Sequence, residues 1–362
     1  MELDTRKRAV LRHVVEVYID DAEPVSSSTI ARSYGRELAQ RRRPETISSA
    51  TIRNVMAELE AGGYLAQPHS SSGRVPTEKG LKLYLDDLMS PKLRPWDRTR
   101  LDEVAATADA SSLPTALGQS LAGLSGQVAL IALPGLSGAK FREIGLVRMS
   151  AGRFVAFFVA PVGIVQQRLV EVDFDLSSDE LQRIQNFLNE RLVGRSLDEV
   201  RTHIASELAD AQTAFDSEKK RAFAIGQQAI PSGAPSLVVE GTTRLIEQPE
   251  FTDIGRLRSL VHAIEDKSAL LGILDKLIAG PHTVRSFADG ARDDDSVRVL
   301  LASEHHIGDM HEVSLVGRCV VDPSGQQTTV SILGPQRMDY GRLVALVDYA
   351  SNLLVKYWDQ TR

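Results

Sequence analysis

Residues 48–77 limit what this chain can fold into more than any other stretch. Their sequence is SSATIRNVMAELEAGGYLAQPHSSSGRVPT. A serine at 48 or 49 can cap a helix, and Gly62 or Gly63 can end it in the left-handed conformation. Four apolar residues recur at the spacing of one helix face: Ile52, Val55, Met56 and Leu59. The stretch therefore predicts a short, sharply bounded amphipathic helix.

A tight hairpin is predicted directly after this helix. Tyr64 to His69 and Arg74 to Thr77 have the composition of short strands, and a Ser-Ser-Ser-Gly turn joins them. Such a hairpin after a recognition helix is a wing.

Two further helices are predicted upstream. Val10, Val14 and Val17 share one face of a helix over Ala9 to Asp20. Pro24 ends that helix, and the serines at 26–28 offer caps for a second helix through Ile30 and Tyr34. Three helices and a hairpin in this order predict an N-terminal winged helix-turn-helix.

The outward face of the third helix predicts contacts with DNA. A recognition helix lies in the major groove, where Arg can bind guanine and Asn can bind adenine. Arg74, beside the turn glycine, is expected at a phosphate or in the minor groove. The candidate DNA-binding residues are Ser48, Ser49, Ala50, Thr51, Arg53, Asn54, His69, Ser71, Ser72, Gly73 and Arg74.

At these residues the chain resembles a known family, the heat-inducible transcription repressor HrcA. The resemblance rests on AEPVSS (Ala22 to Ser27), SSATIRN (Ser48 to Asn54), LEAGGYLAQPHSSSGRVPTEKG (Leu59 to Gly80) and, far downstream, LGPQRMDYGRLVALVDY (Leu333 to Tyr349). The downstream signature is the more specific, because winged helices are common.

The resemblance implies a homodimer that binds an inverted-repeat operator, the element called CIRCE, upstream of chaperone genes. It also implies that the chaperonin GroEL keeps the repressor active. Heat shock would divert GroEL to unfolded proteins and so release transcription. Marginal stability or aggregation of the free repressor would give this dependence a physical basis.

Two departures from the family pattern lie beside the recognition helix. One is a basic insertion, RELAQRRRPET (Arg36 to Thr46), and the other is Val55 in place of the family's acidic residue. Arg41, Arg42 and Arg43 could bind phosphates or form a solvated basic run, and the sequence leaves both open.

Composition fits a regulator of two or three domains. The 362 residues are 43% hydrophobic and 25% charged, with a net charge of −6. Between Pro24 and Lys82, however, nine Lys and Arg stand against five Asp and Glu, a local charge of +4. Phosphate attraction needs only such a local basic face.

Several protein classes are disfavoured by what the sequence lacks. The single cysteine, Cys319, rules out an internal disulfide. There is no run of ~18 apolar residues and no signal peptide, so a cytoplasmic protein without a membrane contact is expected. Without a P-loop or dinucleotide fingerprint, neither an enzyme nor a bound cofactor is expected.

The remaining chain predicts an α+β arrangement. Strands at 127–133, 141–149, 153–160 and 164–172 precede a helical stretch that contains a short strand-like piece at 237–239, and strands at 297–302, 312–321 and 328–333 follow it. This order predicts one antiparallel sheet interrupted by a mostly helical module. By the resemblance, the interrupted domain is GAF-like and the inserted module dimerises.

The predicted bounds are 1–90 for the winged helix, 91–112 for a linker helix, 113–194 and 291–362 for the GAF-like domain, and 195–290 for the insert. The expected dimer contacts, which could equally pack in the insert's own core, are Leu257, Leu260, Ile264, Leu271, Leu274 and Leu277.

Other polar clusters have simpler explanations than catalysis or metal binding. Asp293 to Asp295 suit a solvated loop, and His305, His306 and His311 suit a polar turn. Arg337, Met338, Asp339 and Tyr340 match the family signature without an evident role, although Asp339 is placed to start a helix.

Two other functions remain possible from the sequence. One is a metabolite-responsive regulator whose GAF-like domain binds a small ligand. The other is an enzyme that carries a DNA-binding domain, as in some cofactor ligases. The missing nucleotide and catalytic motifs argue against the second.

Overall fold

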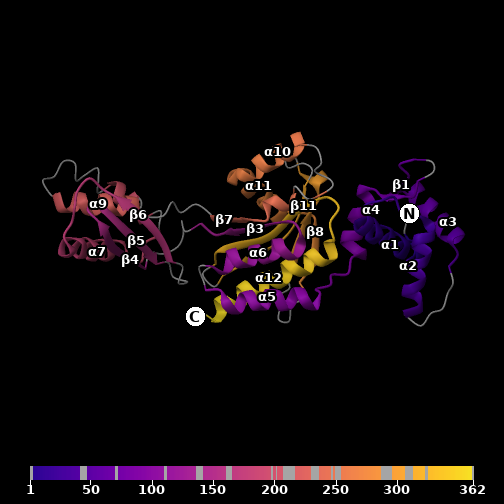
Figure 1. Cartoon of the computed structure of the whole chain (residues 1–362), viewed down its shortest axis with the longest axis horizontal. Coiled ribbons are helices and arrows are strands. Elements are labelled where there is room, and N and C mark those ends of the chain that lie inside the picture. The colour runs from indigo at the N-terminus through magenta and orange to yellow at the C-terminus, as the bar shows by residue number, and fades with distance from the viewer. Residues whose placement is uncertain are drawn as a thin grey trace.

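The structure is a computed structural model of the whole chain (Figure 1). It describes residues 3–40, 47–69, 72–109, 112–135, 142–159, 165–196, 199–200, 202–206, 217–229, 236–245, 248, 254–286, 296–305, 313–322 and 325–360. Helices and antiparallel sheets form three groups along the long axis (Figure 1). The mixture of helices and antiparallel sheets confirms the predicted α+β class.

The N-terminal module comprises the described residues between 3 and 88. Its elements are α1 (Thr5–Asp21), α2 (Ser27–Gln40), α3 (Ser49–Ala61), β1 (Leu65–Ala66), β2 (Val75–Pro76), α4 (Glu78–Leu83) and a π-helical turn, η1 (Tyr84–Leu88). Asp4 caps α1 by accepting from the Lys7 amide at 2.8 Å. Apolar side chains of α1, α2 and α3, among them Val14, Ile30 and Met56, are fully buried between the helices. The three helices therefore share one small core.

A six-stranded antiparallel sheet, here the large sheet, forms the middle of the molecule. Its order is β7-β3-β11-β10-β9-β8. The strands are β3 (Val128–Leu133), β7 (Ser236–Glu240), β8 (His282–Arg285), β9 (Ser296–Leu300), β10 (Val313–Val321) and β11 (Gln327–Pro335).

Helices cover both faces of the large sheet (Figure 1). They are α5 (Pro95–Thr107), α6 (Leu113–Ser125) and α12 (Tyr340–Gln360) on one side, and α10 (Ile254–Glu265) and α11 (Lys267–Ile278) on the other. Ala129 and Ile131 pack with α6 and α12, whereas Val128 and Leu130 pack with α10 and α11. Because strand side chains alternate between faces, β3 has to be apolar throughout.

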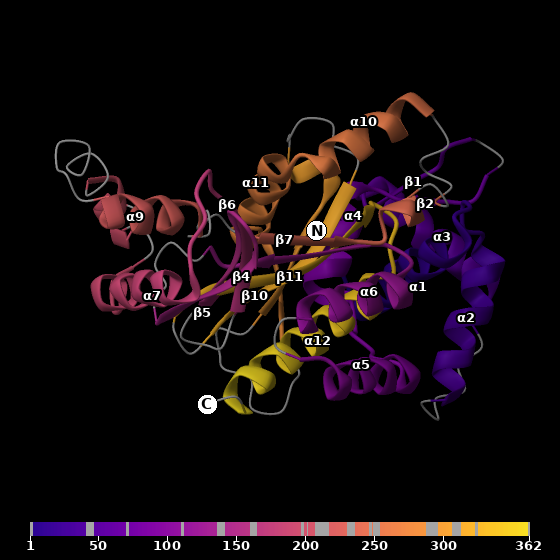
Figure 2. The same cartoon turned by 60° about the vertical axis from the view of Figure 1, so that its left-hand side comes forward.

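The third group is the three-stranded module, which comprises the described residues between 143 and 229. It contains β4 (Glu143–Ser150), β5 (Arg153–Val159), β6 (Val165–Glu171), α7 (Ser178–Leu192) and α9 (Ser217–Ala229). Figure 2 shows α7 and α9 side by side next to these strands. Phe154, Leu188 and Phe223 belong to a core that is separate from the core of the large sheet. The module is therefore built around its own apolar centre.

This division differs from the single interrupted sheet that the sequence predicted. β7 pairs with β3 through five residue pairs, and α10 and α11 cover the large sheet, so the predicted insert at 195–290 is not one unit. The described residues between 143 and 229 lie outside the large sheet and form a sheet of their own. The apolar pattern of a stretch can indicate a strand but does not show which sheet the strand joins.

The predicted dimer residues on α10 and α11 are part of the internal core. Leu260, Ile264, Leu274 and Leu277 are buried against the large sheet, and Leu271 is half-buried. The prediction that these side chains form a dimer contact is therefore wrong for the four buried ones. The side chain of Leu257 lies outside the described residues.

Candidate nucleic-acid interface

Helix α3 is held at both ends and along one face. The Ser48 side chain caps it by accepting from the Thr51 amide at 3.1 Å. Gly63 follows its end with a φ of +76°. The inward residues Ile52, Val55, Met56 and Leu59 are buried, as the spacing predicted. Its position in the module is thus fixed by capping and packing together.

The opposite face of α3 is open to solvent. Ser49, Ala50, Arg53 and Asn54 are exposed, and Thr51 is half-buried. In Figure 1, α3 lies at the outer end of the N-terminal module, away from the large sheet. The predicted base-contacting side chains therefore come together on one accessible surface, within the first two turns of the helix.

The hairpin tip is closed by Ser72. Its amide donates to the His69 carbonyl at 2.9 Å, and the His69 amide donates to the Ser72 hydroxyl at 3.0 Å. A Cβ at Gly73 would lie 2.5 Å from the backbone of Val25, so only glycine fits there. The sequence predicted Gly73 in the turn. The structure shows that glycine is needed there because the backbone passes close to Val25. Ser71 lies outside the described residues.

Arg74 is turned inward rather than outward. Its backbone exchanges two 2.9 Å hydrogen bonds with Val25, which adds a bridge beside β2. Its guanidinium holds the Glu60 carboxylate of α3 through Nε and Nη2, each at 2.9 Å, and its side chain is 15% exposed. A DNA contact by Arg74 would have to use guanidinium N–H groups that Glu60 does not hold, or break this ion pair. Sequence reasoning missed the pair because Glu60 lies 14 residues away, on another element.

A polar network fixes α1 to α2 behind the exposed face. Arg12 and His13 of α1 both contact the Glu37 carboxylate, with His13 Nε2 at 2.7 Å from it. His13 also packs against the ring of Tyr34. Burial lowers the pKa of His13, although the hydrogen bond to Glu37 opposes that shift.

Comparison with known proteins decides the family. A profile described as "HrcA protein C terminal domain" matches residues 115–344, and a curated relative named heat-inducible transcription repressor HrcA, from Geobacter sulfurreducens, is 33% identical over 98% of this chain and 97% of its own length. The chain belongs to the HrcA family.

Other HrcA proteins match over a similar extent. Relatives with the same name from Syntrophobacter fumaroxidans and Sorangium cellulosum are 32% and 35% identical, over 98% and 96% of this chain and 97% and 95% of their own. A solved structure described as a hypothetical protein at 2.2 Å resolution covers both chains completely, with a TM-score of 0.63 and 21% identity. That likeness concerns the fold alone. As a member of a family of transcription repressors, an HrcA chain binds DNA.

Other polar clusters in this HrcA chain offer no competing site among the described residues. His305 Nε2 lies 2.7 Å from the Val313 carbonyl, whereas Asp293 to Asp295, His306 and His311 lie outside the described residues, as do Arg41 to Arg43. No described group of three or more His, Cys, Asp or Glu side chains is arranged to hold a metal ion. None of the described helices is long and apolar enough to span a membrane.

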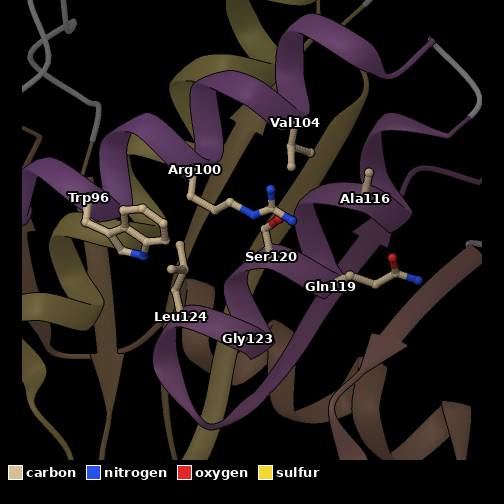
Figure 3. Close-up of a pocket in the computed structure, with 8 residues that line it drawn as sticks. All are labelled: Trp96, Arg100, Val104, Ala116, Gln119, Ser120, Gly123 and Leu124. Atoms are coloured by element: carbon tan, nitrogen blue, oxygen red, sulfur yellow. The ribbon is translucent and has the colours of Figure 1, made fainter.

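A groove of about 350 Å³ lies between α5 and α6 (Figure 3). Trp96, Arg100 and Val104 line it from α5, and residues from Ala116 to Leu124 line it from α6. Trp96 is 72% exposed, and Arg100 donates to the Glu103 carboxylate at 3.2 Å. The metabolite alternative needs a polar-lined pocket in the middle domain. This groove is open to solvent and does not provide one.

Proposed function

We propose that this chain is a homodimeric repressor that binds an inverted-repeat operator of the CIRCE type and thereby controls chaperone genes. The observation that carries the proposal is the arrangement of α3: one face is locked into a core, and Arg53 and Asn54 stand exposed on the other. A helix held in this way can enter the major groove without loss of its own packing.

In this proposal the N-terminal module is a winged helix-turn-helix. Arg53 would bind guanine and Asn54 adenine, each through two hydrogen bonds. Ser48, Ser49, Ala50 and Thr51 stand at the helix start, where backbone N–H groups favour a phosphate. The hairpin would act as the wing, with His69, Ser71, Ser72, Gly73 and Arg74 at or near the backbone of the DNA.

The three-stranded module is our candidate for the dimer contact, and the large sheet with its helices is the GAF-like part. Val147, Val155 and Leu169 stand side by side across its outward face, and Val147, Met149 and Leu169 are each at least half exposed. Exposed apolar patches of this kind mark protein contacts. In a two-fold dimer the same patch would meet itself.

The edges of this sheet favour a face-to-face contact over edge pairing. Asn189 of α7 bonds the backbone N–H and C=O of Ile144 on β4, and Gln185 accepts from the Leu146 amide at 2.9 Å. On the other edge, Gln228 accepts from the Glu171 amide at 3.1 Å. These side chains occupy the backbone groups that a partner strand would need.

The same apolar face supports a dependence on GroEL. A monomer would leave Val147, Met149 and Leu169 in water, and such surface favours aggregation. A chaperonin that binds exposed apolar surface would then control how much repressor reaches the dimeric, DNA-binding form. Heat shock, by diverting the chaperonin, would lower that amount.

The deciding experiment is a gel shift of the full chain on DNA from upstream of chaperone genes. One probe carries the inverted repeat, and a second has one half-site scrambled. We expect binding to the intact repeat, weaker binding to the scrambled probe, and more active repressor when GroEL is added. Parallel reactions with candidate metabolites test the ligand alternative. A metabolite that restores or abolishes binding without GroEL would favour that alternative.

A further inference from the structure

The loop between β11 and α12, residues Gln336 to Asp339, crosses from the large sheet to the N-terminal module. Arg337 Nη1 donates to the Ile19 carbonyl at 2.6 Å, a contact between residues 318 apart in sequence. Ile19 lies in the last turn of α1, where carbonyl groups have no helical N–H partner. A guanidinium there also meets the negative end of the helix dipole. Arg337 therefore caps a helix that belongs to another module.

The same loop and the start of α12 hold the linker that leaves the N-terminal module. The Lys92 amide donates to the Gly341 carbonyl at 3.2 Å. Arg342 binds Asp97 of α5 through two bonds of 2.9 and 2.8 Å, and Asp97 is fully buried. Asp339 orients this pair by capping α12: its Oδ1 accepts from the Arg342 amide at 3.0 Å, as its position in the sequence suggested.

A second polar clamp lies where η1 packs against β8, the edge strand of the large sheet. His282 of β8 is buried, with Nδ1 at 2.6 Å from Asp86 of η1 and Nε2 at 2.9 Å from Glu304. Lys82 of α4 lies 3.4 Å from the same Glu304. This clamp thus joins the N-terminal module to the sheet at a different place from Arg337.

Apolar packing is continuous between the two clamps. Tyr84 and Leu85 of η1 belong to the same buried cluster as Met338 and Tyr340 of the signature and the α12 face of the large sheet. A module attached by a shared core and two polar clamps has one orientation on the sheet. A module on a free linker would have many.

We infer that Arg337, supported by Arg342 and the Asp86–His282–Glu304 clamp, is a positioning residue for DNA binding: it fixes the angle at which α3 is presented to the operator. This inference rests on the proposed dimeric repressor. Two recognition helices must stand a whole number of DNA turns apart to bind both half-sites together. A single half-site makes no such demand.

Loss of the Arg337 contact should affect binding to one half-site and binding to both half-sites differently. Loss of the Arg337 contact leaves α3 and its exposed face intact, so the affinity for a single half-site is unchanged. Binding of both half-sites weakens, because the second site is reached from a spread of orientations and its effective concentration falls. The same spread makes the protein more tolerant of altered half-site spacing. A merely structural role for Arg337 would not alter this tolerance.

The test compares full-length Arg337→Met with wild type and with Arg195→Met, a matched change at an exposed arginine of the three-stranded module. Titrations use a single half-site duplex and inverted repeats with zero, one or two base pairs added between the half-sites. For Arg337→Met we expect half-site affinity within twofold of wild type, intact-repeat affinity about tenfold lower, and a smaller penalty for each added base pair. Arg195→Met should match wild type throughout.

Asp86→Asn is the second variant, because the Asp86 side chain is 49% exposed and its replacement leaves the core intact. It should show the same pattern with a smaller loss. Unchanged repeat affinity and spacing preference in both variants would overturn the positioning role. Equal loss on half-site and repeat would also overturn it. If wild type itself fails to bind the half-site at low salt, the proposed operator binding is what fails.

Discussion

The two ends of the molecule are attached to the large sheet in opposite ways. The N-terminal module shares a continuous buried cluster with α6 and α12 and is tied down by Arg337 and His282. The three-stranded module has a separate core. One end is therefore an extension of the sheet domain, and the other is a unit packed around a core of its own.

The exposed surfaces of the two ends also differ in chemistry. The open face of α3 offers polar and basic groups, which suit bases and phosphates. The open face of the three-stranded sheet offers Val147, Met149 and Leu169, which suit another apolar surface. Under the proposed function, DNA contact and dimer contact would lie at opposite ends of the molecule, so each should be open to change without the other.

The largest effect should come from charging the apolar face. Val147→Asp with Leu169→Asp should give monomers on sedimentation, because two carboxylates cannot be buried without partners. Affinity for the inverted repeat should fall by ~10²–10⁴, the range expected when linked binding is lost. Half-site affinity should remain. Gln182→Glu with Asn186→Asp on exposed positions of α7 adds the same charge as a control. If the Val147→Asp, Leu169→Asp variant stays dimeric, the dimer contact lies elsewhere.

A smaller, local effect is expected at the other end. Arg53→Ala should weaken operator binding by ~1–3 kcal/mol and relax base preference at one position in each half-site. Folding and dimerisation should be unaffected, because Arg53 is exposed on the side of α3 opposite the core. Binding is compared at one salt concentration, with Arg195→Ala as the control. Equal affinity of variant and wild type for operator DNA would mean that α3 is not part of the DNA interface.

If the basic insertion binds phosphates, it should contribute to the salt dependence of DNA binding. Replacement of Arg41, Arg42 and Arg43 together with Gln should weaken specific and non-specific binding alike if the insertion touches phosphates. The slope of log K against log salt should then become shallower by ~0.9 for each phosphate that an arginine no longer neutralises. A slope equal to that of wild type would mean that these three arginines are solvated and do not contact phosphates.

Arg74→Ala should act mainly on stability. It removes the partner of Glu60 and the tie between hairpin and α3, a loss of about 1 kcal/mol for a pair of this exposure. The free energy of unfolding is measured with urea. Glu60→Gln, which also breaks the ion pair, should cause a similar loss. If DNA affinity fell strongly in Arg74→Ala but not in Glu60→Gln, the result would support the predicted phosphate contact of Arg74.

The smallest effect concerns pH. Because burial lowers the pKa of His13 below its ordinary value of 6.5, the unfolded chain binds more protons than the folded chain between the two values. The stability that neutral His13 contributes is present above pH 6.5 and is lost as the pH falls toward the folded pKa. Urea titrations from pH 7.5 to 5 should show this loss. In His13→Gln the loss should be smaller, and an identical pH profile would exclude His13 as its source.

Local signals in the sequence determined much of the fold. Capping serines, glycines at helix ends and 3.6-residue spacing located α3 and its buried face, and apolar stretches bounded by Pro and Gly located nearly every strand. The strand β8 was missed because only four residues follow Gly280 and Pro281 before the pattern ends. These features depend on neighbours within a few residues, so the sequence contains what is needed to predict them.

Only the tertiary structure decided which elements belong together. Strand polarity did not show that β7 joins β3, that β4 to β6 form a separate sheet, or that the leucines of α10 and α11 are internal. Nor did it show that Arg74 binds Glu60 or that Arg337 caps α1. The sequence pattern of apolar residues is the same whichever apolar surface they pack against. An arginine can donate hydrogen bonds to any carboxylate or carbonyl within reach. The choice among such partners depends on three-dimensional proximity, which the folded chain alone supplies.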